Sequence, residues 1–328
     1  MSLTLLNFTK ILDKNFFHER KPKIAVGVSG GPDSLALTIL LNHWILKKKG
    51  TIVALIVDHR IRNESLSESI QTKFFLNELK IRTKVLFVPR NKVKEGKMNQ
   101  ARFNRFEQLI NYCKKNEIFH LFLGHHFNDN LETFILRKIA GSNYEGLNSI
   151  QLIKILGNIQ VIRPLLFFTK KEILSFNEKF NLPFIFDPSN LNIKYSRIAI
   201  REYLNLNKNK KKEIIKEFKL IKNNYSLYIQ MIYEIMNLLI IKAKYKTLVL
   251  NAKNFLLLNN ELKEIIITKS MQYVNNSNFY IRSKKIKDLI RKISKFRSIS
   301  LNSYKTSIQK LDNEIIVQGF RSKIYKDY

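Results

Sequence analysis

Cysteine is almost absent from this chain of 328 residues, which contains Cys113 and no other thiol. A lone cysteine excludes an internal disulfide and any cluster held by several thiolates, such as a zinc ribbon or an iron–sulfur centre. Apolar runs are also short, well below the roughly 20 residues that cross a bilayer, and residues 1–10 lack the apolar segment of a signal peptide. We therefore expect a cytoplasmic protein without a membrane partner and without redox chemistry.

Glycine and proline are scarce in the second part of the chain. Nine of the ten glycines lie at or before Gly157, and all six prolines lie at or before Pro188. Because these residues mark turns, we expect the two parts to be built differently. We predict a catalytic domain over residues 1–203, and a smaller, basic and mainly helical domain over residues 204–328 that begins with a linking helix.

Acidic side chains are outnumbered throughout. The chain has 58 Lys and Arg residues against 26 Asp and Glu residues, a formal net charge of +32. Residues 201–328 carry 27 basic and 10 acidic side chains, a net charge of +17. Such a surface attracts polyanions, nucleic acid above all. Compositional drift towards Lys, Asn and Ile is the alternative origin, so charge alone does not establish nucleic-acid binding.

Short apolar runs alternate with helical patterns in the first part of the chain. The runs predict buried strands at 24–28, 52–57, 83–88 and 119–123. Helices are predicted from the apolar stretch 34–46, the four-residue repeat of Leu66, Ile70 and Phe74, and the apolar face of Phe103, Phe106 and Ile110. This alternation predicts an α/β fold with a doubly wound parallel sheet, whose ligands bind beyond the carboxyl ends of the strands.

The first predicted strand runs directly into a glycine turn and a helix. Glycines let the backbone approach a ligand, and free N–H groups at a helix start bind phosphate. The turn is neither a Walker A loop, since it lacks the lysine, nor a dinucleotide-binding G-x-G-x-x-G. The candidate phosphate-binding residues are Ser29, Gly30, Gly31, Pro32, Asp33 and Ser34.

Polar residues follow the second predicted strand and begin the helix after the third. Asp58 and His59 stand where a nucleotide base or ribose would be met, although a capped helix start with a surface histidine is an equal alternative. Arg102 and Arg105 are three residues apart, hence neighbours on a helix face that we expect to lie opposite Phe103 and Phe106. They could hold a phosphate or form a solvated basic face.

The segment after the fourth predicted strand contains His125, His126, Asp129 and Glu132. These residues suggest a metal site, but zinc needs a better ligand set. A hard Mg²⁺ ion held by carboxylates and ATP phosphates fits better. Asp129 could instead be only a helix cap.

Together these segments resemble the tRNA(Ile)-lysidine synthases, a family of the N-type ATP pyrophosphatases. The resemblance covers about residues 22–204 and includes further matches at 141–142, 146–147, 163–166, 187–190 and 195–201. Three residues depart from the family pattern: Ile198 replaces an asparagine, and Asn143 and Ser149 replace glycines.

The resemblance implies an ATP-dependent ligase. The 2-carbonyl oxygen of the wobble cytidine of tRNA(Ile) with anticodon CAU would be adenylated, and free L-lysine would then displace AMP to give lysidine, which changes decoding from AUG to AUA. The resemblance also implies that the glycine loop binds the phosphates of ATP and that Asp33 and Asp129 bind Mg²⁺. His126 would assist proton transfer or neutralise phosphate charge, and Arg105 and Arg201 would position phosphates of ATP or RNA.

The second domain contains a strongly basic helical segment. Residues 281–297 carry eight basic side chains and one acidic, and interleaved Ile286, Leu289, Ile290 and Ile293 predict a buried face. We predict that this segment binds the tRNA backbone, with a membrane-surface helix as the alternative. The predicted RNA contacts are Arg282, Lys284, Lys285 and Arg291. The closing segment, residues 315–317 and Phe320 after residues 301–308, predicts a small hairpin or sheet.

Two other functions compete with this prediction. A tRNA thiolase would share the loop, but those that thiolate cytidine use paired cysteines, which this chain lacks. A non-catalytic RNA-binding protein with a vestigial nucleotide fold would release no pyrophosphate. No stable protein partner is predicted, and a homodimer stays open.

Overall fold

The computed structural model describes residues 2–58, 65–89, 98–184, 196–276 and 283–320. The chain forms two compact units, Met1–Lys219 and Leu220–Tyr328. Helix α9 (Lys208–Leu239) contains the boundary between them. Across the described ranges, every helix is too short or too polar to span a membrane.

The first part of α9 belongs to the first unit because of what it packs against. Phe218 is buried, and its ring lies 5.4 Å from that of Phe134 and 5.9 Å from that of Phe127, centroid to centroid. Lys138 Nζ donates to Glu217 Oε1 over 2.7 Å. The compact units therefore divide later than residue 203, and the proposed functional boundary at 203/204 stays a prediction.

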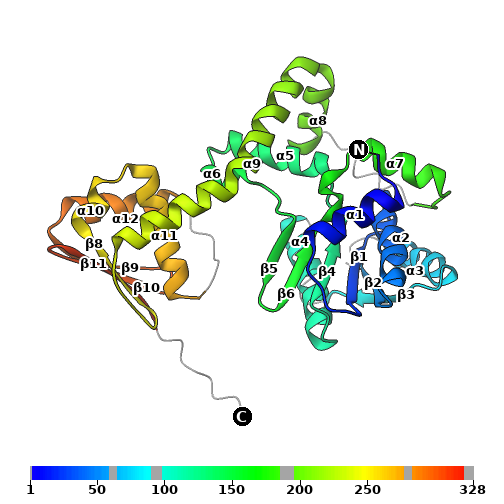
Figure 1. Ribbon diagram of the computed structural model, residues 1–328, viewed down its shortest axis with the longest axis horizontal. Coiled ribbons are helices and arrows are strands. Elements are labelled where there is room, and N and C mark those ends of the chain that lie inside the picture. The colour runs from blue at the N-terminus through cyan, green and yellow to red at the C-terminus, as the bar shows by residue number, and fades with distance from the viewer. Residues whose placement is uncertain (1, 59–64, 90–97, 185–195, 277–282, 321–328) are drawn as a thin grey trace, which may run out of the picture. The chain divides into compact units, whose positions relative to one another are not determined.

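The first unit is built on a six-stranded sheet with the order β3-β2-β1-β4-β6-β5 (Figure 1). Strands β1, β2, β3, β4 and β6 are parallel to their neighbours, and β5 pairs antiparallel at one edge. The bounds are β1 (Lys23–Val28), β2 (Thr51–Asp58), β3 (Arg82–Phe87), β4 (His120–Leu123), β5 (Ile153–Leu156) and β6 (Ile159–Ile162). The doubly wound parallel sheet and its first four strands are confirmed.

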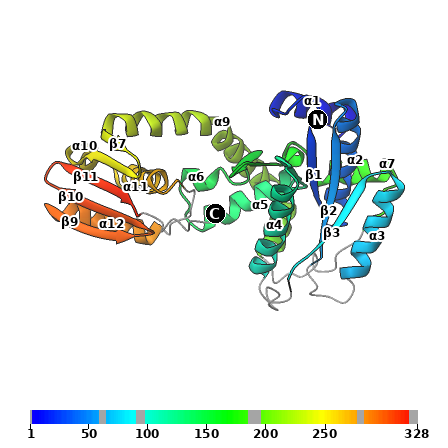
Figure 2. The ribbon, with the colours of Figure 1, turned by 90° about the horizontal axis from the view of Figure 1, so that it is seen from below.

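Helices cover both faces of this sheet, as Figure 2 shows for β1–β3. Ile24 and Val26 pack into one core with α1 (Leu5–Asn15), α2 (Pro32–Lys47) and α3 (Ser65–Glu78), while Ala25 packs with α4 (Met98–Lys115) on the opposite face. Strands buried on both faces are apolar without alternation, which explains why the sequence revealed them. The remaining elements are α5 (Phe127–Ile139), α6 (Tyr144–Leu147), the 3₁₀ turn η2 (Pro164–Phe167), α7 (Lys170–Lys179) and α8 (Ser196–Leu206).

Helix α3 is confirmed, but its apolar repeat faces away from the core. Leu66, Ile70 and Phe74 are 46%, 55% and 66% exposed, whereas Ser69 and Leu76 are buried. The repeat therefore predicted the helix correctly without marking its packed face.

The second unit combines helices with a five-stranded antiparallel sheet of order β7-β8-β11-β10-β9. Its strands are β7 (Ile240–Lys244), β8 (Thr247–Asn251), β9 (Ser298–Ser303), β10 (Thr306–Leu311) and β11 (Glu314–Gly319). Its helices are the part of α9 from Leu220 on, α10 (Ala252–Leu257), α11 (Asn260–Val274) and α12 (Ser283–Lys295). The small hairpin or sheet expected from residues 301–308, 315–317 and Phe320 corresponds to β9, β10 and β11, and the sheet is larger because β7 and β8 belong to it. The predicted apolar face of α12 is buried in the core with α11, at Ile286, Leu289, Ile290 and Ile293.

Candidate active site

The glycine turn after β1 forms a tight loop that leaves backbone groups open to a ligand. Gly30 adopts φ 77°, a left-handed conformation that favours glycine. Pro32 begins α2, and within the described chain no side chain caps that helix start. Its first N–H groups and the positive end of the helix dipole therefore remain available to an anion.

Ser34 holds this loop in shape. Its buried Oγ accepts a hydrogen bond from Ser29 N–H over 3.1 Å and donates to the Gly31 carbonyl over 3.0 Å. Gly124, directly after β4, lies against the loop, since a Cβ added there would stand 3.2 Å from the backbone of Asp33 and of Ser34. The loop thus has a fixed shape and a close neighbour at the end of the central strands.

Asp33 lies among cationic and titratable groups contributed by other elements. Its Oδ1 is 2.6 Å from Lys170 Nζ and 3.8 Å from His126 Nε2. Lys170 is the first residue of α7, and Asn177 of the same helix donates to the Pro32 carbonyl over 3.0 Å. Helix α7 therefore braces the loop and supplies a positive charge beside it, which the sequence analysis missed.

His126 and Asp129 form the cap of α5. Asn128 and Asp129 N–H groups donate to His126 Nδ1, and the His126 N–H donates to Asp129 Oδ2 over 3.0 Å. Asp129 is thus part of the helix cap, and its role as a Mg²⁺ ligand stays a prediction. Because Nδ1 accepts, the neutral ring carries its proton on Nε2, which lies 3.5 Å from Asp129 Oδ2 and faces Asp33 as well.

The donor set around His126 suits a hard cation that also binds phosphate. In the ranges that the structure covers, no three or more His, Cys, Asp or Glu side chains converge as a metal cage. Two carboxylates, those of Asp33 and Asp129, each have an oxygen within 3.8 Å of His126 Nε2. Mg²⁺ typically takes one or two carboxylates and completes its shell with phosphate and water. These residues therefore fit Mg²⁺ better than zinc.

Glu132 binds the predicted phosphate ligand Arg201. The Glu132 side chain is 2% exposed, and its Oε1 accepts from Arg201 Nε over 2.6 Å. This hydrogen bond raises the pKa of Arg201. Arg197 Nη1 lies 3.9 Å from both Glu132 Oε2 and Asp129 Oδ1. Helix α8 thus brings two guanidinium groups to α5, next to the cap of that helix.

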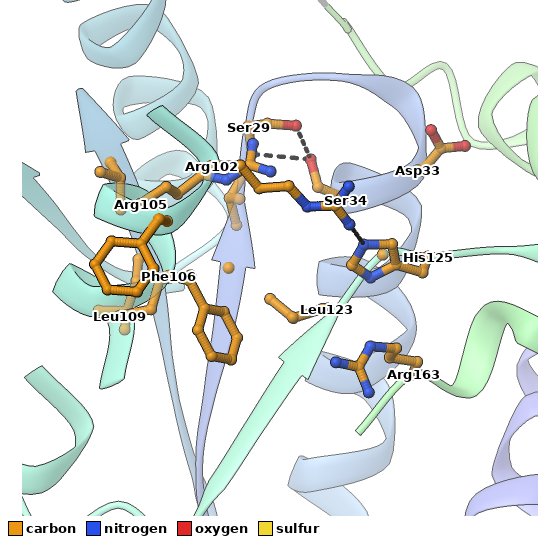
Figure 3. Close-up of a pocket in the computed structure, with 16 residues that line it drawn as sticks. Ser29, Asp33, Ser34, Arg102, Arg105, Phe106, Leu109, Leu123, His125 and Arg163 are labelled. Carbon is orange, nitrogen blue, oxygen red and sulfur yellow. Dashed lines mark hydrogen bonds between the residues drawn. The ribbon is translucent and has the colours of Figure 1, made fainter. Parts of the chain in front are cut away.

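A cavity of about 500 Å³ opens beside the loop, at the carboxyl ends of the central strands (Figure 3). Its size suits a small ligand such as a nucleotide. Apolar walls come from Leu55, Val57, Leu109 and Leu123. The expectation that Arg102 and Arg105 lie opposite Phe103 and Phe106 is wrong, because all four line this cavity. At about 100° per residue, Phe106 lies next to Arg102 on the helix surface, and Asn104 alone of positions 102–106 is absent from the cavity lining and buried.

The cavity is rich in hydrogen-bond donors. His125 Nε2 accepts from Arg102 Nη2 over 3.2 Å; burial, followed by the charges of Arg163, Arg102 and Arg105, lowers the pKa of His125 to about 3 even though Asp129 opposes the shift. The ring is therefore neutral at pH 7, and its Nδ1–H finds no acceptor in the described chain.

Arg163 adds a second donor of this kind. Its Nη1 donates to the Gln151 carbonyl over 3.1 Å, while its buried Nε–H has no partner among the residues described. Burial and the charge of Arg102 lower the pKa of Arg163 to about 10, so the group stays charged at pH 7. Burial in the cavity also lowers the pKa of Arg105, which solvent still reaches. The cavity is therefore suited to a ligand that is anionic and rich in acceptors.

Two other predicted sites have structural partners. Asp58 is buried, and its Oδ1 accepts from Ser65 Oγ over 2.7 Å at the start of α3; its nucleotide-binding role and the helix-cap alternative both stay predictions. In the second unit, Lys284, Lys285 and Arg291 are exposed on α12, with Arg291 Nη2 2.7 Å from Asp288. His59 and Arg282 lie outside the described residues.

The fold and the site together define an α/β nucleotide-binding protein with a phosphate loop at the first strand. The chain belongs to the PP-loop domain family, whose model matches residues 4–208. This membership supports ATP as the nucleotide.

Curated relatives give a closer comparison. The chain is 37% identical over 199 residues to a tRNA(Ile)-lysidine synthase of Orientia tsutsugamushi (strain Boryong), covering 61% of this chain and 45% of that protein. It is 35% identical over 219 residues to the enzyme of that name from Wolbachia pipientis wMel, covering 66% and 50%. The chain thus spans about half the length of the curated relatives it matches.

A solved structure shows the same fold. The U34-tRNA thiolase NcsA from Methanococcus maripaludis superposes with a TM-score of 0.56 over 67% of this chain and 78% of that one, at 19% identity. At this identity the likeness shows a common fold and nothing of the reaction.

Proposed function

We propose that the chain is an ATP-dependent ligase that joins L-lysine to the wobble cytidine of tRNA(Ile) with anticodon CAU. One observation carries the proposal. The phosphate loop, the donor-rich cavity and the two carboxylates meet at the carboxyl ends of the parallel strands, in the part of the chain that resembles curated tRNA(Ile)-lysidine synthases.

The loop and the cavity would divide the nucleotide between them. The open N–H groups at the start of α2 would bind the phosphates, and charge that develops on departing pyrophosphate would meet those amides. The apolar walls would hold the base, while His125 Nδ1–H and Arg163 Nε–H would donate to acceptors of the nucleotide. Arg105 would bind phosphate at the mouth of the cavity.

The reaction would take place in two displacements. The 2-carbonyl oxygen of cytidine attacks the α-phosphorus of ATP, and the bond to the bridging oxygen breaks to release pyrophosphate. A neutral amine of lysine then attacks carbon 2, the carbon–oxygen bond breaks, and AMP leaves with that oxygen. His126 Nε2, within 3.8 Å of a carboxylate oxygen of Asp33 and of Asp129, would hold or pass a proton at this end of the strands. Mg²⁺ bound by the two carboxylates would neutralise phosphate charge.

The second unit would bind the tRNA body. The exposed side chains Lys284, Lys285 and Arg291 lie on a helix whose opposite face is buried, so their positive charge faces outward. Such a surface binds backbone phosphates without reading sequence. The target base would be unstacked and drawn into the catalytic site, because bases inside an A-form helix cannot be reached.

The structure gives no support to the thiolase alternative. Cys113 is fully buried in the core with α4, and burial raises its pKa to about 12, so its thiol is neither accessible nor ionised at pH 7.

The decisive test is incubation with ATP, radiolabelled lysine and tRNA(Ile) transcripts that carry either CAU or a mutated anticodon. We expect the label to enter the CAU transcript alone, and we expect AMP and pyrophosphate to be released as lysine is incorporated. Release of ADP, or equal labelling of both transcripts, would contradict the proposal. Absence of tRNA-dependent pyrophosphate release would favour the non-catalytic alternative.

A further inference from the structure

The phosphate loop has no lysine of its own. Residues 29–34 contain no basic side chain, whereas a Walker A loop places a lysine on the phosphates. The fold brings one from elsewhere in the sequence, since Lys170 Nζ lies 2.6 Å from Asp33 Oδ1. The two residues are 137 positions apart, so no local motif could reveal the pair.

The position of Lys170 is fixed by its own helix and by two others. Thr169 and Glu172 form a capping box at the start of α7, and the Lys170 N–H donates to Asn128 Oδ1 of α5 over 2.9 Å. Asn177, two turns further along α7, donates to the carbonyl of Pro32 in the loop. Because one hydrogen bond ties α7 to α5 and another ties it to the loop, the start of α7 is held beside the loop, and the ammonium group of Lys170 reaches Asp33 from there.

The electrostatics of the loop require a cation at this point. A carboxylate at the start of α2 repels a polyphosphate, yet Asp33 lines the same cavity as the loop. Lys170 neutralises that carboxylate across a side chain–side chain contact that is only partly buried. The same ammonium has three donors, of which Asp33 uses one, and can therefore serve a phosphate oxygen as well.

We propose that Lys170 is the phosphate-binding lysine of this loop and contacts the pyrophosphate portion of the bound nucleotide. The assignment rests on the proposed function in one respect, the use of the loop for a nucleotide triphosphate. It would give the site what the lysine of a Walker A loop provides, with the charge delivered from α7 instead of from the loop.

A purely structural role is the competing explanation. Lys170 could merely hold Asp33 in place, and its removal would then act through Asp33 alone. The two explanations differ once Asp33 has lost its charge. If Lys170 binds phosphate, it still matters in an Asp33→Asn background; if it only holds Asp33, it no longer does.

The test measures binding of inorganic pyrophosphate by calorimetry in the presence of EDTA, so that no divalent cation contributes. The variants are Lys170→Met, Lys170→Arg, Asp33→Asn and the double variant Asp33→Asn/Lys170→Met. Lys171→Met is the matched control, since it removes the same charge from the exposed neighbouring position of the same helix.

We expect Lys170→Met to weaken pyrophosphate binding by about tenfold or more, because it removes a charge-assisted hydrogen bond. Lys170→Arg should retain most of the affinity, and Lys171→Met should change it less than twofold. Asp33→Asn should bind pyrophosphate more tightly than the wild type, and adding Lys170→Met should remove at least tenfold of that affinity. Equal affinities of Asp33→Asn and the double variant would overturn the assignment, as would a wild type that binds pyrophosphate no better than Lys170→Met.

Failure of the proposed reaction can be told apart from failure of this assignment. If lysine is not incorporated but Lys170→Met binds pyrophosphate more weakly as expected, the roles of the loop and of Lys170 are supported and the proposed substrate is wrong. If lysine is incorporated and the Lys170 variants bind pyrophosphate like the wild type, the reaction stands and this role of Lys170 is wrong.

Discussion

In residues 1–219 the candidate functional groups stand in short segments at the ends of strands, whereas in residues 220–328 they are spread along the exposed face of α12. The first arrangement brings a loop, a cavity and two carboxylates together at the carboxyl ends of the parallel strands. The second presents separate cations above a buried apolar stripe. The first suits chemistry at one point, and the second suits a long polyanion. Changes in one unit should therefore affect catalysis, and changes in the other should affect affinity.

The largest effect is expected at Asp33. Asp33→Ala removes the carboxylate that faces His126 and Lys170, and we expect lysine incorporation to fall by at least about a hundredfold, the order seen when one electrostatic group of an active site is removed. Affinity for tRNA, measured by filter binding, should stay within twofold of the wild-type value. Strong residual incorporation would mean that the site lies elsewhere.

The reciprocal change neutralises α12. Replacing Lys284, Lys285, Lys287 and Arg291 by Gln should weaken tRNA binding and flatten its dependence on salt, by about 0.7 to 0.9 in logarithmic slope for each phosphate that the helix no longer neutralises. Catalysis at saturating tRNA should change little.

Four other lysines provide a control with the same change in net charge. Lys47, Lys49, Lys114 and Lys115 are exposed and directly precede strands β2 and β4, at the sheet edge opposite the cavity. Their substitution by Gln should leave the salt slope unchanged. Equal slopes for both quadruple variants would place the RNA footprint away from α12.

Features that depend on local sequence could be predicted, whereas features that depend on contacts between distant segments could not. The glycine loop and the four central strands were predictable because their signals are local. Strands β5 and β6 were missed; each has four residues, and the polar side chain of Lys154 or Gln160 interrupts its apolar run, whereas the polar His120 of β4 precedes an uninterrupted apolar run. The turn between them, with Gly157 at φ 59°, was the available signal.

The rest of the site depends on tertiary contacts. His125, Arg163 and Lys170 join the site from segments that lie far apart in the sequence; the pairing of β4 with β1 and β6 brings His125 and Arg163 there, and the packing of α7 brings Lys170. His125 was considered as a metal ligand, but its burial beside three arginines could not be inferred from spacing. The sequence predicted that Arg102 and Arg105 lie opposite Phe103 and Phe106 on α4, whereas in the structure all four line one cavity.

Burial of His125 predicts a pH effect confined to the first unit. Its pKa is lowered to about 3 in the folded chain, below an ordinary value of about 6.5, so between these values the unfolded chain binds a proton that the folded chain does not. Stability should therefore fall as pH falls below about 6.5, by at most about 1.4 kcal/mol per pH unit.

A His125→Gln variant tests this expectation, because its amide oxygen can still accept from Arg102 but does not titrate. Between pH 7 and 5.5 the wild type should lose about 2 to 4 °C of Tm more than the variant. Identical losses would show that His125 is not kept neutral by burial.

The smallest effect on stability is expected for an apolar residue on the exposed face of α3. The two units differ in whether apolar residues at helical spacing mark the buried face. In α12 the apolar residues at helical spacing form the buried face, whereas in α3 the repeat Leu66, Ile70 and Phe74 is exposed. Ile70→Ala should change the free energy of unfolding by less than about 0.5 kcal/mol. Ile290→Ala, the same substitution at a side chain that is 5% exposed, should cost about 2 to 5 kcal/mol. Urea unfolding of both variants measures the contrast. Because the chemistry is identical, a large loss at Ile70 would show that something in the folded chain covers the α3 stripe, and the difference in packing between the two helices would then disappear.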